Sequence, residues 1–125
     1  HQDKGLSRTF VAVVEDQPER ICGYYALTLT EVDTGSLAEV RRGKLPRMIP
    51  GVRMGRLAVD TDFQEKQLGT LLLMDAVERV RRIHEHAGVT GLFVDALDSH
   101  AAHFYANFGF EAFKDDPLKL FLPVR

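Results

Sequence analysis

The segment Asp60–Thr70, reading DTDFQEKQLGT, carries residue types that could bind an anion. The pattern predicts a strand that ends at Val59 and a helix that begins at about Gln64. The free N–H groups and the positive dipole end of a helix start attract anions such as a pyrophosphate. Lys66 and Gln64 add side-chain donors, and Gly69 would let a ligand approach the backbone. Because many helix starts bind nothing, an ordinary helix start remains the alternative.

A second candidate lies near the end of the chain, in Ser99–Phe110, reading SHAAHFYANFGF. Tyr105 falls in the middle of this predicted helix, among small and aromatic residues. Its phenol could donate a proton in a reaction. The alternative is a core tyrosine with a satisfied hydroxyl, which is common in proteins.

Four histidines raise the question of a metal site. His84 and His86 are two residues apart on a helix, so they do not share a face. His100 and His103 could share one, but no carboxylate or cysteine completes a ligand set with zinc spacing. Cys22 lies in an apolar strand and is interpreted as a small buried hydrophobe. The sequence therefore predicts no metal site.

Basic residues are concentrated in Arg41–Arg56, which contains six of them and no acidic residue. The whole chain has 16 basic and 18 acidic residues, for a net charge of −2. A local cationic stretch can attract phosphates on a slightly acidic molecule. The alternative is a solvated loop with ordinary surface charge.

Strand and helix patterns place these residues on a single mixed sheet. Leu73, Val77, Val80, Ile83 and Ala87 recur at helical spacing and predict one buried helix face. Strand–helix–strand units with helices of this length imply right-handed crossovers and locally parallel strands. The predicted strands are Thr9–Glu15, Arg20–Glu31, Val52–Val59, Thr90–Leu97 and Leu118–Val124, with helices at Gln64–Ala87 and after Asp98. The first two strands should form an antiparallel hairpin, so the fold class is α/β or α+β.

Composition limits the class of protein. The 125 residues are 45% hydrophobic and 27% charged, which predicts one globular domain over residues 1–125 and excludes a disordered or collagen-like chain. One cysteine cannot form an internal disulfide, and no apolar run approaches the length of a membrane span, so the cytoplasm is the expected location. The chain does not begin with Met, which suggests processing or a longer parent protein.

Taken together, the two candidate segments resemble the GNAT acetyltransferase superfamily. The resemblance lies in RLAV at the end of a strand, the Gln-led helix start and the later AAHFYANFGF. The pyrophosphate loop of that superfamily follows the pattern Gln/Arg-x-x-Gly-x-Gly/Ala. Gln64 and Gly69 fit this pattern, whereas Gln67 replaces the usual first glycine.

Within the superfamily, the segments GYYALTLTEV, LPRMIP, GRLAVD, FYANFGFE and DPLKLFL look like the GNAT toxins of bacterial toxin–antitoxin pairs. The resemblance implies acetylation of the amine of aminoacyl-tRNA, which blocks translation, and neutralisation by a ribbon-helix-helix antitoxin. The group often dimerises, so a homodimer is an expected form. The resemblance also implies that a first strand and first helices normally precede the point where this chain starts.

The resemblance assigns roles to individual residues. Tyr105 would protonate the departing thiolate of coenzyme A, and acetyl-CoA would be the co-substrate. The residues implied to bind acetyl-CoA are Leu57, Ala58, Val59, Gln64, Lys66, Gln67, Leu68, Gly69, Thr70 and Phe104. The residues that could then contact tRNA phosphates are Arg41, Arg42, Lys44, Arg47 and Arg53.

The pKa values of possible acceptor amines indicate which kind of amine this site would acetylate. The Arg53–Val59 strand contains no Glu or Asp that could act as a base. An α-amine titrates at about 7.7–8.0 and a lysine amine near 10.4, so the α-amine needs less help to lose its proton. Two alternatives stay open: a GNAT enzyme acting on a small amine or a protein N-terminus, and a catalytically silent acyl-CoA-binding module.

Overall fold

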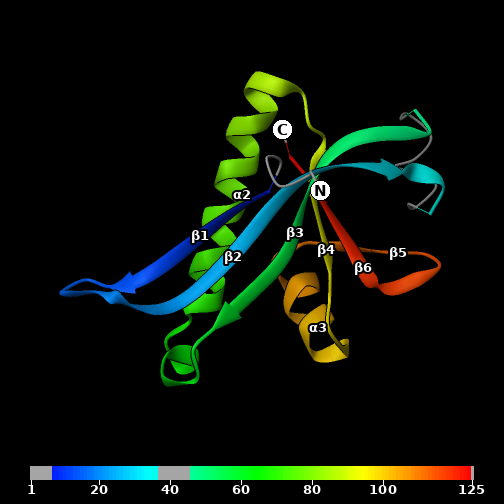
Figure 1. Cartoon of the computed structure of the whole chain (residues 1–125). Helices are drawn as coiled ribbons and strands as arrows, with labels where there is room; N and C mark the ends of the chain where they lie inside the picture. Colours follow the sequence, from blue (N-terminus) through cyan, green and yellow to red (C-terminus); the bar gives the residue numbers. More distant parts are fainter. Residues whose placement is uncertain (1–6, 37–45, 125) are drawn as a thin grey trace.

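The computed structural model describes residues 7–36 and 46–124, and among these the side chains of all but residues 36, 65 and 66. Its six strands form one sheet in the order β1-β2-β3-β4-β6-β5, as Figure 1 shows. The strands are β1 (Ser7–Val14), β2 (Gln17–Asp33), β3 (Met48–Val59), β4 (Gly91–Asp95), β5 (Glu111–Phe113) and β6 (Asp116–Pro123). The helices are α2 (Leu68–Ala87) and α3 (Ser99–Phe108), with short 3₁₀ turns η2 (Thr34–Ser36) and η3 (Thr61–Lys66).

The first three strands form an antiparallel meander, which confirms the predicted hairpin. The turn between β1 and β2 is shorter than predicted, because Val14 already pairs with Gln17. Pro18 therefore lies inside β2, where the sequence predicted a turn. It is tolerated because pairing of β2 with β3 starts only at Gly23, so its missing N–H breaks no bond to that strand.

The two strand–helix–strand units behave differently. The unit β3–α2–β4 gives the predicted parallel pair, with Val52 opposite Leu92. In the second unit, the chain leaves α3, forms the short strand β5 and turns back as β6, which inserts between β4 and β5. The last strand is thus antiparallel to β4, and a parallel assignment for it is wrong. The three residues of β5 are too few to show a strand period.

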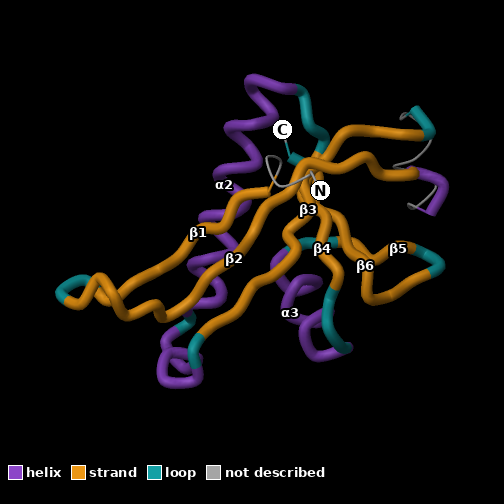
Figure 2. Tube along the Cα trace, viewed as in Figure 1, coloured by secondary structure: helices purple, strands orange, loops and turns teal. Residues whose placement is uncertain are grey.

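One face of the sheet is covered by both helices (Figure 2). The core there contains Tyr25 and Leu73, both with 0% exposed surface, and extends to Tyr105 of α3. Side chains alternate along a strand, and the opposite face holds a smaller apolar cluster around Phe93 and Phe121. The helix face predicted from the spacing is buried at Leu73, Val77 and Val80; Ala87, at the end of the helix, is exposed.

Local sequence signals account for three of the helix ends. Gly88 ends α2 with φ 72° and donates its N–H to the carbonyl of His84. Asp98 caps α3 by accepting from the N–H of Ala101 at 2.9 Å, and Gly109 ends that helix with φ 119°. Within the described ranges, no helix has the length and apolar character to cross a membrane.

Candidate active site

The sheet opens into a fork between β3 and β4. The two strands pair only over Val52–Met54 and Leu92–Val94, and beyond this point they diverge (Figure 1). The register between β2 and β3 shifts at the same place, since Ala26 pairs with Arg56 and Leu27 with Met54, which leaves Gly55 as a bulge. A bulge bends its strand and increases the local twist. The bulge therefore accompanies the separation of β3 from β4.

One edge of β3 faces the opening of this fork. Leu57, Ala58 and Val59 pair with β2 on one side. Backbone groups of successive residues in an antiparallel pair alternate between the two edges. The groups that point away from β2 lie beyond Met54, the last residue of β3 that pairs with β4, so they are available to a bound chain such as pantetheine. This is the arrangement that the resemblance implied for these three residues.

The start of α2 differs from the sequence prediction. The helix begins at Leu68, not at about Gln64, because residues 61–66 form η3 and Gln67 interrupts the two segments with φ 58° and ψ 24°. Asp60 caps η3 by accepting from the N–H of Asp62. The side chain of the N-cap residue Gln67 forms no capping hydrogen bond, so among the described side chains the cap position leaves the first N–H groups available to an anion. The helix start that the sequence predicted as an anion site is thus shifted to Leu68, Gly69 and Thr70.

Gln67 occupies a left-handed backbone conformation that costs a non-glycine residue about 1 kcal/mol. We expect Gln67→Gly to raise the free energy of unfolding by about 1 kcal/mol or slightly less, because glycine also has a more flexible unfolded chain. Urea-induced unfolding of the two proteins measures this difference. A variant that is less stable than wild type would contradict it.

Three residues predicted to bind acetyl-CoA are brought together at the mouth of the fork. A Cβ atom placed on Gly69 would lie 3.8 Å from Cγ2 of Val59 and 3.9 Å from Cζ of Phe104. These residues come from α2, β3 and α3, which are distant in sequence. The absence of a side chain at Gly69 leaves a methyl-sized space between these two apolar side chains, next to the N–H groups of the first turn. The helix backbone is uncovered at this point, so a ligand can approach it closely.

The structure shows neither Gln64 nor Lys66, the two predicted side-chain donors, directed at an anion site. Gln64 is exposed, and its Nε2 donates to the carbonyl of Val59 at 3.1 Å, so it ties η3 to the end of β3. The side chain of Lys66 lies outside the described part of the structure. Leu68 and Thr70 are half-buried at the start of α2. The anion site is therefore built mainly from backbone groups.

Tyr105 lies in an aromatic environment on α3. Its ring is 5.3 Å from that of Phe104 and 5.4 Å from that of Phe110, measured between centroids. Only 7% of the residue is exposed, and burial raises the pKa of its phenol to about 12. The phenol is therefore protonated at neutral pH, as a proton donor must be. Its neighbour Phe104 lines the space at Gly69, which places α3 beside the mouth of the fork.

The raised pKa of Tyr105 has a consequence for stability at high pH. The unfolded phenol titrates near 10 and the folded one at about 12, so the folded state holds this proton more tightly. Below about pH 10 the phenol adds no pH dependence, and between about pH 10 and 12 the wild type loses about 2–3 kcal/mol. We expect Tyr105→Phe to lose less stability between pH 8 and pH 11 in urea unfolding. An equal loss in both proteins would contradict this.

Histidine ligation of a metal has no support in the geometry. Nδ1 of His84 lies 2.5 Å from the carbonyl oxygen of Val89, a contact that closes the loop after α2. Among the residues that the structure describes, no group of three or more His, Cys, Asp and Glu is arranged to hold a metal ion. Cys22 is buried and its thiol donates to the carbonyl of Ala12 at 3.3 Å.

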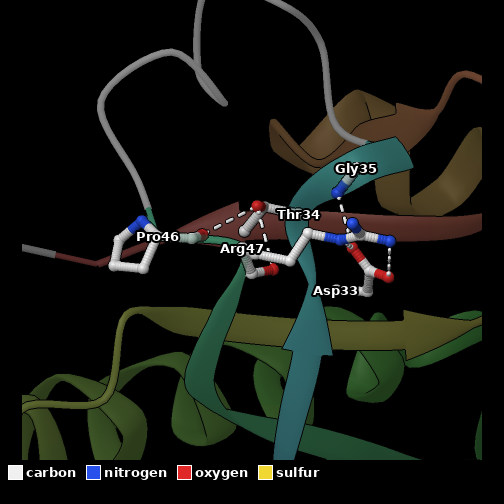
Figure 3. A network of polar contacts seen from close by, with 5 residues as sticks. All are labelled: Asp33, Thr34, Gly35, Pro46 and Arg47. Atoms are coloured by element: carbon white, nitrogen blue, oxygen red, sulfur yellow. Dashed lines mark hydrogen bonds and ion pairs between the residues drawn. The ribbon is translucent and has the colours of Figure 1, made fainter.

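The basic stretch is only partly described, since Arg41, Arg42 and Lys44 lie outside the described residues. Arg47 forms two bonds to the carboxylate of Asp33, at 3.0 and 3.3 Å, as Figure 3 shows. The hydrogen bonds from Arg47 and from the N–H of Gly35 lower the pKa of Asp33. A phosphate would have to compete with this carboxylate for Arg47.

Arg53 is also paired. Its Nη1 lies 2.8 Å from Oδ2 of Asp95, the last residue of β4. Both side chains line a pocket of about 350 Å³ on the sheet face opposite the helices. Other acidic residues that line this pocket are Glu31, Asp33, Asp115 and Asp116. These carboxylates disfavour a phosphate close to Arg53.

A sheet that forks beside the start of a helix suits the binding of an acyl-CoA, and the class of protein follows from the sequence. Residues 6–112 match the family model described as the acetyltransferase (GNAT) domain. The chain belongs to the GNAT acetyltransferase family.

Within this family the chain is similar to characterised toxins. It is 35% identical over 122 residues to the tRNA-acetylating toxin of Mycobacterium tuberculosis, covering 98% of this chain and 72% of the relative. Its fold matches AtaT complexed with acetyl-methionyl-tRNAfMet, with a TM-score of 0.88, 29% identity and coverage of 95% and 72% of the two chains. It also matches an AtaT mutant toxin bound to the C-terminus of the antitoxin AtaR and acetyl-CoA, with a TM-score of 0.78, 30% identity and coverage of 98% and 71%.

Proposed function

We propose that this protein transfers the acetyl group of acetyl-CoA to the α-amine of aminoacyl-tRNA and thereby acts as a translation-blocking toxin. The observation that carries the proposal is the placement of Gly69, whose missing side chain leaves a methyl-sized space between Val59 and Phe104 beside the first turn of α2. It supports binding of acetyl-CoA by a chain that is 35% identical to a tRNA-acetylating toxin.

In the proposed reaction, Leu57, Ala58 and Val59 bind the pantetheine through their backbone, and the turn at Leu68–Thr70 binds the pyrophosphate. The amine nitrogen bonds to the acetyl carbon as the carbon–sulfur bond breaks. Tyr105 donates its phenolic proton to the departing sulfur, and the amine releases a proton to water. Because the phenol has a pKa of about 12, it assists as a neutral donor and is not ionised beforehand.

The choice of amine rests on the chemistry around the fork. The stretch from Arg53 to Val59 carries no carboxylate, and the nearby Asp95 is held by Arg53. A site without a strong base favours an amine that is already partly neutral at pH 7–8, and an α-amine with a pKa of about 7.7–8.0 meets this condition.

The proposed toxin function also implies partners for the protein. The tRNA phosphates contact the basic stretch that includes Arg41, Arg42, Lys44, Arg47 and Arg53. Arg47 exchanges its ion pair with Asp33 for phosphate, and Arg53 is the weakest of these contacts because carboxylates surround it. A ribbon-helix-helix antitoxin neutralises the protein, a homodimer is its expected form, and the cytoplasm is its place of action. Residues 1–125 act as a single acetyltransferase domain.

Mass spectrometry of a charged tRNA pool, after incubation with acetyl-CoA and the protein, tests the proposal. The expected product is N-acetylated aminoacyl-tRNA, with a yield that falls steeply between low and moderate salt because phosphate contacts release counterions. Acetylation of free amines or peptide N-termini, without acetylated tRNA, would instead favour a different GNAT substrate. Acetyl-CoA binding without turnover on any acceptor would favour a silent acyl-CoA-binding module.

A further inference from the structure

A polar cluster of one buried and two partly exposed side chains joins α2 to the first two strands. Tyr25 of β2 has 0% exposed surface, and its hydroxyl donates to Oδ2 of Asp75 on α2. Nε of Arg79, one turn further along α2, donates to the Tyr25 hydroxyl at 2.9 Å and to Oδ2 of Asp75 at 3.1 Å. The guanidinium of Arg79 lies 4.0 Å from the ring centroid of Phe10 in β1, and that ring stacks on Tyr25 at 5.1 Å.

The cluster supplies a directional contact on a helix face that is otherwise apolar. The buried residues of α2 are Leu72, Leu73, Ala76, Val77 and Val80. Apolar burial is non-directional, so these contacts alone permit small shifts of the helix along the sheet. A hydrogen bond requires a donor–acceptor distance of about 3 Å and a near-linear angle. The bond between Tyr25 and Asp75 therefore selects one position of α2.

The charges in the cluster suit this bond at neutral pH. Burial and the neighbouring Asp75 raise the pKa of the Tyr25 phenol, so it stays a donor. The hydrogen bond from Tyr25, together with Arg79, lowers the pKa of Asp75, so its carboxylate stays an acceptor. Arg79 compensates the negative charge.

The position of α2 on the sheet also determines the geometry of the candidate active site. Tyr25 pairs directly with Leu57 of β3, a residue at the fork. Asp75 lies on the same rigid helix as Gly69, about 9 Å away at 1.5 Å per residue. The space between Gly69 and Val59 is therefore fixed from both sides by the pair of Tyr25 and Asp75.

We propose that Tyr25, Asp75 and Arg79 are positioning residues for acetyl-CoA: they set where the first turn of α2 lies relative to the β3 edge. The inference rests on the proposed binding of acetyl-CoA at this site. None of the three residues needs to touch the co-substrate, so they act through the placement of the backbone groups at Leu68–Thr70.

The test compares Tyr25→Phe and Asp75→Asn with wild type, using calorimetric binding of acetyl-CoA and the separate values of KM and kcat. We expect the Kd and the KM for acetyl-CoA to rise about fivefold to tenfold in each variant, with kcat at saturation within about twofold, because a contact in one polar network has a coupling of this order. The double variant should be no worse than the weaker single one, since both changes act on the same bond: the first removes its donor, and the second replaces its charged acceptor with a weaker, neutral amide oxygen. Glu78→Gln is the matched control, because Glu78 also carries a carboxylate on α2 but forms exposed ion pairs with Arg81 and Arg82.

Two results would overturn the inference. Folded Tyr25→Phe and Asp75→Asn proteins with lower melting temperatures but a wild-type Kd would show a purely structural role. An equal rise of Kd in Glu78→Gln would show a general effect of charge on α2. If wild type itself fails to bind acetyl-CoA, the proposed function fails first and the inference falls with it.

Discussion

Replacing Tyr105 with phenylalanine is expected to lower kcat of acetyl transfer by about a hundredfold or more, since proton donation by a positioned group contributes about 10²–10⁴-fold. The ring should keep its contacts with Phe104 and Phe110, so the fold and the Kd for acetyl-CoA should stay close to wild type. We expect kcat and not the Kd for acetyl-CoA to change, because the proton is needed only when the carbon–sulfur bond breaks.

Steady-state kinetics at saturating acetyl-CoA, with direct binding measured in parallel, separates these effects. Tyr24→Phe is the matched control, because Tyr24 is a half-buried tyrosine in β2 and its removal takes away a phenol outside α3. In cells, expression of wild type should arrest growth and Tyr105→Phe should relieve the arrest. A Tyr105→Phe enzyme with the kcat of wild type would remove the phenol from the mechanism.

The second large effect is expected at Gly69. In Gly69→Ala, the added Cβ would make ordinary contacts with Val59 and Phe104, so the protein should fold. Alanine is also the better helix former by about 1 kcal/mol, so the free energy of unfolding should not fall. The methyl group nevertheless enters the space beside the open N–H groups of α2. We expect the Kd for acetyl-CoA to rise about tenfold, which corresponds to about 1.4 kcal/mol.

Stability and binding should therefore move in different directions in this variant. Thermal unfolding and calorimetric titration with acetyl-CoA, on the same preparation, measure both. A Gly69→Ala protein that binds acetyl-CoA as tightly as wild type would mean that the co-substrate does not pass through this space. A variant that binds less tightly only because it is partly unfolded would show the loss in both measurements.

The sequence by itself determined the local features of the protein. The order of the main strands and helices, the stop of α2 at Gly88 and the cap of α3 at Asp98 depend on neighbouring residues, and the structure confirms them. The family was also accessible from sequence, because its motifs are short and continuous. These features involve interactions over a few residues, which a periodic or capping pattern reports directly.

The tertiary structure decided the features that depend on distant partners. Gly55 marks a bulge only because β2 and β3 pair around it, and Gln67 takes a left-handed conformation where η3 meets α2. The insertion of β6 beside β4 has the same origin. Tyr25 and Asp75 are 50 residues apart, and Arg53 meets Asp95 across 42. Such contacts form because the pairing of the strands and the packing of α2 on the sheet fix which side chains meet, and no local pattern encodes that choice.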